Sequence, residues 1–264
     1  MTDTRSLPVT RIRSGVRSRS LDAVVAEAPL EIRLGGVPLA VLMRTPGRDA
    51  DLITGFAITE GIVLRHGEID EVRPVPGDPE GNRWELVLAA GVTVDPERFR
   101  RNLYSTSSCG VCGKASIDAV RVASPPLPEG PVLAAGLLLE MPEKMRRHQE
   151  GFEETGGLHA AAVFDGGGEL LVLREDIGRH NAVDKAVGAL ASSGDLGGES
   201  VLLVSGRISF EVVQKAAVAS LPFVAGVSAA SSLAVELADE LGMTLIGFLR
   251  GDGFNLYTGE DRLR

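Results

Sequence analysis

Hydrophobic residues in the second half of the chain gather in short runs that alternate with amphipathic stretches. Runs typical of buried strands lie at residues 200–206, 222–228 and 243–250, and helical spacing lies at 178–192, 209–220 and 231–242. This alternation predicts an α/β fold in which parallel strands form a sheet covered by helices on both faces. Upstream, a glycine turn predicts a hairpin at 158–176, and Pro142 is suited to the first position of a helix at 142–154.

The first half of the chain carries shorter elements. Two extended runs on either side of Gly35 and Gly36 predict a β-hairpin at 30–44. The spacing of apolar residues in 48–64 suits an amphipathic helix, and residues 83–92 suit another strand. These elements predict a small α+β part ahead of the α/β sheet.

Four prolines within residues 123–131 mark the clearest linker. The linker separates an N-terminal α+β part, residues 21–130, from a C-terminal α/β domain, residues 131–264. Residues 1–20 precede both and hold five arginines against a single aspartate. This composition favours a solvated, disordered arm, and a docking arm for an acidic partner is the alternative.

The chain of 264 residues has a formal net charge of −9. This charge argues against general nucleic-acid binding, because that affinity comes mostly from neutralising phosphates with a basic surface. The longest apolar run, at 132–139, is far shorter than the ~20 residues that span a bilayer. No charged leader followed by an apolar core opens the chain. We therefore expect a cytoplasmic protein with no membrane span.

Both cysteines, Cys109 and Cys112, lie in the segment STSSCGVCGKASID at residues 105–118. Small polar residues and glycines surround them, as is typical of a mobile loop. Two thiols at this spacing suit a redox disulfide, half of a metal site or the carriage of a sulfur atom. In a reducing compartment such a pair is more often chemical or metal-binding than structural.

Two predicted strand ends carry residues suited to an anionic ligand. In α/β sheets ligands collect where strands end, because loops there present backbone N–H groups and the positive ends of helices. The segment VSGRISF places Ser205, Gly206 and Arg207 at one such end, and FLRGDGF places Arg250 beside two glycines at another. An ordinary turn is the alternative in each case.

A third segment, REDIGRHNAVDKAVG at 174–188, is dense in polar side chains between a predicted strand and a predicted helix. A charged helix start explains one or two of them. Eight such groups favour a binding or catalytic surface. They are Arg174, Glu175, Asp176, Arg179, His180, Asn181, Asp184 and Lys185.

Several of these segments are recognisable together. SSCGVCGK, GGLHAAAVFD, EDIGRHNAVDK and SGRISFEVVQKA, in this order, resemble the formate dehydrogenase accessory sulfurtransferase family, FdhD. GFAITEGIV and the terminal LIGFLRGDGFNLYT are similar to the same family. The resemblance therefore covers nearly the whole chain except the basic arm.

This resemblance implies a function. The protein would accept sulfur as a persulfide from a cysteine desulfurase and pass it to the molybdenum bis(molybdopterin guanine dinucleotide) cofactor, a bound substrate required for formate dehydrogenase activity. Cys109 would carry the persulfide, and Cys112 would either attack it or tune its neighbour. The substrate would contact Phe248, Leu249, Arg250, Gly251, Asp252 and Gly253, with Ser205, Gly206 and Arg207.

The family's fold is similar to that of cytidine deaminase, a three-layer mixed sheet, and its members resemble homodimers. Zinc deaminases carry H-x-E before P-C-x-x-C. Neither His159 nor His180 is followed by that glutamate, and the two cysteines precede both histidines. The resemblance therefore implies the scaffold, and the order of the motifs argues against the deaminase chemistry.

Two alternatives remain for the cysteine pair. A thioredoxin-like dithiol oxidoreductase would use both thiols, although its motif normally lies at a strand-to-helix junction. A non-enzymatic zinc or nucleotide-binding module is the other alternative. Its nitrogen ligands would come from His66, His148, His159 and His180, which show no metal-ligand spacing. We expect the protein to hold no metal of its own.

Overall fold

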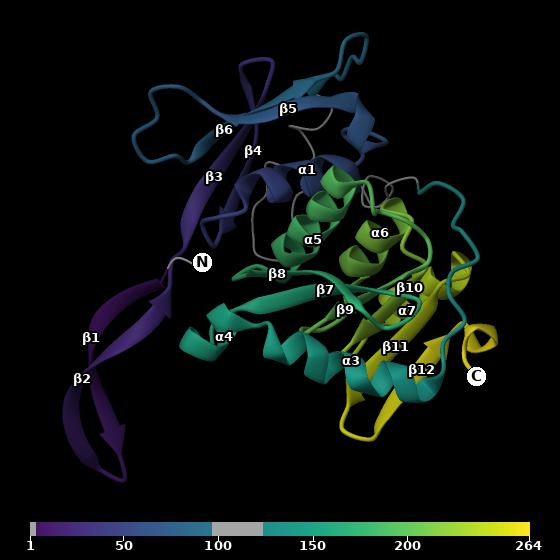
Figure 1. Ribbon diagram of the computed structural model, residues 1–264. Coiled ribbons are helices and arrows are strands. Elements are labelled where there is room, and N and C mark those ends of the chain that lie inside the picture. Colours follow the sequence, from purple (N-terminus) through teal and green to yellow (C-terminus); the bar gives the residue numbers. More distant parts are fainter. Residues whose placement is uncertain (1–3, 97–123) are drawn as a thin grey trace.

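A mixed sheet of six strands forms the centre of the molecule in a computed structural model that describes residues 4–96 and 124–264 (Figure 1). In spatial order its strands are β12 (Gly253–Thr258), β11 (Thr244–Arg250), β10 (Phe223–Gly226), β9 (Ser200–Val204), β7 (His159–Asp165) and β8 (Leu170–Asp176). Strands β9, β10 and β11 run parallel, as their continuous apolar runs predict. Strands β7, β8 and β12 pair antiparallel with their neighbours.

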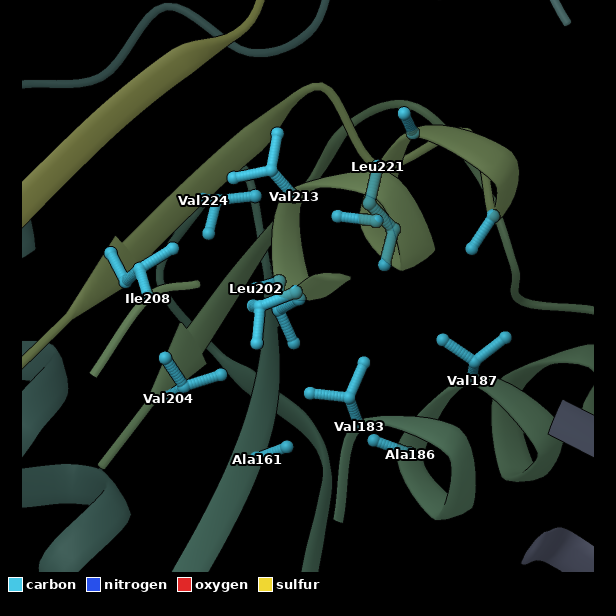
Figure 2. Close-up of a cluster of buried hydrophobic side chains, with 14 of the residues drawn as sticks. Ala161, Val183, Ala186, Val187, Leu202, Val204, Ile208, Val213, Leu221 and Val224 are labelled. Atoms are coloured by element: carbon cyan, nitrogen blue, oxygen red, sulfur yellow. The ribbon is translucent and has the colours of Figure 1, made fainter. Parts of the chain in front are cut away.

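Helices cover both faces of this sheet. One face packs against α3 (Ala135–Arg147), and the other packs against α5 (Arg179–Ser193), α6 (Phe210–Val218) and α7 (Ser232–Glu240). Because successive side chains of a strand point to opposite faces, β9 sends Leu202 and Val204 towards α5 and α6 and Leu203 towards α3. Figure 2 shows the first of these clusters, where Leu202 lies near Val183. The structure thus has the expected three layers.

A smaller sheet of four strands lies on the outer side of α5, beyond one further helix (Figure 1). Its strands are, in spatial order, β4 (Val37–Arg44), β3 (Ala28–Leu34), β6 (Arg83–Leu88) and β5 (Ile69–Pro74). The helix is α1 (Asp49–Thr59), whose Leu52, Ile53 and Phe56 pack against this sheet. Short 3-10 turns occur at His66–Glu68 and Glu260–Arg262. The hairpin, the helix and the strand expected in this part are all present.

Two glycines bring α1 and α5 into backbone contact. A Cβ at Gly55 would lie 1.7 Å from the carbonyl oxygen of Asp184, and one at Gly188 would lie 1.9 Å from that of Asp51. Real Cβ atoms do not approach carbonyl oxygens so closely, so neither position has room for a side chain. These two glycines therefore fix how the smaller sheet sits on the larger one.

The N-terminal arm differs from the expectation of disorder. Residues 4–25 form an antiparallel hairpin of β1 (Thr4–Arg13) and β2 (Val16–Val25), which projects away from the body (Figure 1). Its turn places Ser14 and Gly15 at positive φ, 49° and 81°, as a two-residue hairpin loop requires. The expected boundary at residue 20 falls inside β2. Composition misled here because pairing between the two strands satisfies the backbone of a polar segment.

Two other expectations are wrong in detail. Pro142 lies inside α3 and does not begin it, because the apolar residues at 135–139, assigned no element from sequence, form its first turns. The segment FLRGDGF was expected only to follow the last strand of the sheet. It is the turn of a hairpin between β11 and β12, and β12 was not predicted. A short helix, α4 (Glu150–Thr155), follows α3.

Candidate functional site

A groove of about 800 Å³ lies between the helices α3 and α4 and the ends of several strands of the larger sheet. Residues from α3, α4, the start of β7, the end of β9 and the β11–β12 turn line it. Its lining includes apolar side chains such as Leu139 and Phe152 together with the cations of Arg146 and Arg250. The carboxylate of Glu143 also lines it, and a partly apolar cavity with a few charged groups is typical of a site for a small organic ligand.

Three of the residues predicted from sequence meet in this groove. Ser205 follows β9, and Arg250 and Gly251 stand at the end of β11, yet all three line the same cavity. The Ser205 hydroxyl accepts a hydrogen bond from the backbone N–H of Ala160 at 2.9 Å. That bond ties β7 to the loop after β9 and fixes the position of the hydroxyl at the groove.

Arg250 owes its position to an irregular backbone. Phe248 has a φ of 55°, which a bulky residue rarely adopts, and the pairing of β11 with β12 shifts register between Gly247 and Arg250. The backbone N–H of Phe248 donates to the carbonyl of Ser228 at 3.0 Å, which holds the bend. The guanidinium carbon of Arg250 lies 5.4 Å from the centre of the Phe248 ring, within cation–π range.

Other residues predicted for the site do not line the groove. Leu249 is fully buried among the apolar side chains that contact α3, so its side chain cannot touch a ligand in the groove. Asp252 and Arg207 are exposed. Gly206 lies against the ring of His159, where an added Cβ would stand 3.2 Å from Nδ1.

Sequence reasoning missed two residues that line the groove, Arg146 on α3 and Phe152 on α4. The guanidinium carbon of Arg146 lies 4.8 Å from the centre of the Phe152 ring, and Arg146 also pairs with Glu153. No motif marked them, because the packing of α3 beside α4 alone brings them to the cavity.

His159, the first residue of β7, lines the groove near the start of α5 and the end of β9. Burial lowers its pKa below the ordinary value, and the positive charges of Arg179 and Arg207 lower it further, against the opposing charge of Asp176. The imidazole is therefore neutral at neutral pH.

Most polar residues of the 174–188 segment form buried internal pairs, not the exposed surface that their density suggested. Asp176 accepts from Lys185 at 2.7 Å and from the backbone N–H of Thr45 at 3.1 Å. Arg174 pairs with Asp51 of α1 at 2.8 Å, and Glu175 binds two backbone N–H groups at the start of α4. These contacts join β8 to α1, to the residue that follows β4 and to α4, so these side chains have a structural role.

A second buried cluster links α1, α5 and α6. The Nζ of Lys215 lies 2.9 and 3.0 Å from the two carboxylate oxygens of Asp184, 2.9 Å from the hydroxyl of Thr59 and 2.8 Å from Glu60. Burial opposes the charge on Lys215, but the carboxylates of Asp184 and Glu60 outweigh burial and raise the pKa of its ammonium group. Lys215 is therefore charged in the folded protein.

His180 lies between this cluster and the start of α6. Its Nε2 is 3.3 Å from the hydroxyl of Ser209 and 3.9 Å from a carboxylate oxygen of Glu211. Burial lowers the pKa of His180 to about 4, and the charges of Lys215 and Arg179 add to the effect. The ring is therefore neutral at neutral pH. It connects the first turn of α5 to the first turn of α6.

The predicted sulfur-carrying residues, Cys109 and Cys112, lie outside the described residues. Within residues 4–96 and 124–264, no group of three or more histidine, cysteine or acidic side chains is arranged to hold a metal ion. In the same part of the chain, no helix is long and apolar enough to cross a membrane.

Comparison with solved structures defines the class of fold. The chain superposes on a crystal structure from Desulfotalea psychrophila, described as a candidate formate dehydrogenase accessory protein, with a TM-score of 0.80 over 99% of both chains. The two sequences are 22% identical, so the likeness shows a shared mixed α/β fold.

Comparison with sequences defines the family. The model of the FdhD/NarQ family matches residues 25–264. Proteins named sulfur carrier protein FdhD are 49% identical in Streptomyces coelicolor, over 97% of this chain and 94% of theirs, and 48% identical in Mycolicibacterium paratuberculosis, over 97% of both. A protein of the same name from Anaeromyxobacter dehalogenans is 46% identical over 96% of this chain and 92% of its own. The chain belongs to the FdhD/NarQ family.

Proposed function

We propose that the protein is a sulfurtransferase that supplies formate dehydrogenase with a sulfurated molybdenum cofactor. It takes sulfur from a cysteine desulfurase and delivers it to molybdenum bis(molybdopterin guanine dinucleotide), which it binds as a substrate. The observation that carries the proposal is the near 50% identity, over nearly the full length, with proteins named sulfur carriers. The protein acts in the cytoplasm as a homodimer, on a scaffold similar to that of the cytidine deaminases.

The first step is an exchange at sulfur that needs no oxidant. The Cys109 thiolate attacks the outer sulfur of the persulfide on the desulfurase, and the desulfurase thiolate leaves. The outer sulfur is then bonded to Cys109 as a persulfide. Cys112, three residues later in the sequence, either attacks this persulfide or tunes the thiolate beside it.

The groove suits the nucleotide end of the substrate in size and charge. Its volume of about 800 Å³ falls in the range of natural ligand sites, and Arg250 presents a guanidinium there. Arginine binds phosphate oxygens through parallel hydrogen bonds of fixed geometry. In this proposal backbone N–H groups beside Gly206, Gly251 and Gly253 bind the same ligand, because glycine allows close approach.

A transfer assay tests the function. The purified protein is incubated with a cysteine desulfurase and radiolabelled cysteine, then separated and mixed with formate dehydrogenase matured without it. We expect label bound to the protein in a form released by dithiothreitol, and we expect dehydrogenase activity to rise with the amount of labelled protein added. Label that never binds, or activity that does not respond, would contradict the proposal.

The contribution of Arg250 is tested by replacing it with alanine. A charge-assisted hydrogen bond contributes roughly 1.5–3 kcal/mol, so we expect the affinity for GDP, measured by calorimetry, to fall about 10- to 100-fold. Arg73→Ala is the matched control, since Arg73 lies on β5, pairs with Glu71, and neither residue lines the groove. Equal affinities for GDP in the Arg250 variant and the wild type would remove Arg250 from the site.

A further inference from the structure

The N-terminal hairpin of β1 and β2 exposes apolar side chains although it stands apart from the body (Figure 1). At its base the Thr4 hydroxyl donates to Glu154 of α4 at 2.9 Å, and Val25 lies beside Gly157. Beyond this base four large apolar side chains are 47% to 70% exposed, those of Leu7, Ile12, Val16 and Leu21. A two-stranded hairpin is only marginally stable alone in water, so this one indicates a partner that covers it.

A second group of exposed apolar side chains lies on β4, at one edge of the smaller sheet. Val37, Val41 and Met43 are 37% to 51% exposed, and among the described strands β4 pairs with β3 alone. The other exposed large apolar side chains of the described residues stand singly, and they are Leu64, Val132, Leu171 and Leu233. An edge strand with apolar side chains is a site where another chain readily packs. The hairpin and β4 are therefore the two surfaces that can cover each other.

The hairpin and β4 extend in opposite directions from the two residues that join β2 to β3 (Figure 1). Thr4 pairs with Val25 at the base of the hairpin. Ala28 pairs with Arg44 at the near end of β4. At ~3.3 Å per residue the hairpin is about 33 Å long and β4 about 26 Å, so their lengths are similar. A two-fold axis at this junction would lay the hairpin of each copy of the chain along β4 of the other copy.

The charges favour a hairpin on the body of a second copy over contact between two hairpins. Residues 4–25 hold five arginines against the single Asp22, which pairs with Arg11 at 3.0 Å. Within the described part of the chain the other four have no ion pair, and they are Arg5, Arg13, Arg17 and Arg19. The whole chain carries −9, so the rest of it is more acidic still. Two hairpins would repel each other, whereas a hairpin and an acidic body attract.

We propose that the hairpin at residues 4–25 is exchanged between two copies of the chain and packs against β4 of the other copy. This inference rests on the proposed function, since it specifies how the homodimer named there forms. Each copy gives one hairpin and receives one, so a two-fold axis relates two identical contacts. The hairpin together with β4 supplies the ~20–30 residues on each side that a stable interface uses.

Sedimentation velocity on the full chain of 27.8 kDa tests the two surfaces. We expect the wild type to be a dimer. Ile12→Thr/Leu21→Thr on the hairpin and Val41→Thr/Met43→Thr on β4 should each raise the dissociation constant of the dimer about tenfold or more, because apolar burial is lost in both contacts. Threonine retains the preference for a strand. Leu64→Thr is the matched control, since Leu64 is 84% exposed and lies on neither surface, and it should leave the dimer unchanged.

Crosslinking tests which parts of the two copies meet. The background is Cys109→Ser/Cys112→Ser, which removes both natural thiols. One copy carries Ser18→Cys near the tip of the hairpin, and the other carries Val37→Cys at the far end of β4. A bismaleimide should join the two variants when they are mixed. It should join neither variant to itself, because the two hairpins of the dimer extend in opposite directions.

The outcomes separate this inference from the proposed function. A wild type that sediments as a monomer overturns the exchange, even if the hairpin binds anionic vesicles or a nucleic acid. A dimer that neither double variant weakens also overturns it, while the homodimer of the proposed function stands. Crosslinking of Ser18→Cys to itself would show that hairpins meet each other, which contradicts the exchange. If the double variants weaken the dimer but no labelled sulfur reaches the wild type, the exchange stands and the sulfur-carrier function fails.

Discussion

Alanine at position 109 should abolish the binding of labelled sulfur and the activation of formate dehydrogenase. Only a thiolate can displace the desulfurase and hold the transferred sulfur in a covalent bond, and alanine has no atom to form that bond. The loss should be complete, limited by background labelling. The measurement is protein-bound label after incubation with a cysteine desulfurase and radiolabelled cysteine, followed by the dehydrogenase assay.

The two cysteines provide their own comparison. Cys112→Ala should still accept label, because the accepting thiolate at position 109 is intact, although delivery to the substrate is expected to slow. Cys109→Ser keeps the size and polarity of the side chain and should be as inactive as the alanine variant. If Cys109→Ala carries label and restores activity, Cys109 is not the carrier.

Methionine in place of Lys215 should lower the free energy of unfolding by ~3–5 kcal/mol, the usual cost of leaving a buried charge without its partner. Asp184 is fully buried, and its carboxylate receives two of its hydrogen bonds from Lys215 at 2.9 and 3.0 Å. Methionine has nearly the volume of the lysine stem, so the change removes the charge with little loss of packing. Urea denaturation followed by circular dichroism measures the difference.

Two further variants test the origin of that loss. Lys144→Met is the control, because the amine of Lys144 is partly exposed and its loss should cost about 1 kcal/mol or less. The double variant with Asp184→Asn should be more stable than Lys215→Met alone, since it removes both charges of the pair. A loss below 1 kcal/mol in Lys215→Met would show that the cluster contributes little.

The direction in which the pKa of Lys215 is shifted determines how the stabilisation by this cluster depends on pH. The pKa of Lys215 is raised in the folded state, so the folded protein holds that proton more tightly than the unfolded chain does. The stabilisation is fully present below the pKa of an ordinary lysine and is lost as the pH rises through the raised value. Stability from this cluster therefore persists across neutral pH.

The strands and helices of the larger sheet could be predicted because their apolar runs are continuous and of the right length. β12 could not, since GFNLYT has no continuous apolar run and follows β11 after only two residues. The start of α3 was missed because residues 135–139 are all apolar. The alternation of apolar and charged residues that is typical of an amphipathic helix begins only at Glu140. The N-terminal hairpin was hidden by a charged composition that backbone pairing tolerates.

Only those residues of the candidate site that a local sequence pattern marks could be predicted. Ser205 and Arg250 were found because each follows a buried strand beside a glycine. Arg146 and Phe152 were not found, since their neighbourhood depends on how α3 and α4 dock. The 174–188 segment was interpreted as a surface because the partners of its charges, Asp51 and Lys215 among them, are distant in the sequence.

Where α1 crosses α5, neither sheet can lose its structure alone. The contact at Gly55 and Gly188 leaves no space for water between the two backbones, and the Asp184 and Lys215 pair beside it would be exposed if either helix left. Separating the helices would therefore uncover apolar surface and unpaired charges on both sides at once. We therefore expect the two sheets of the described body to unfold together, in a single cooperative transition.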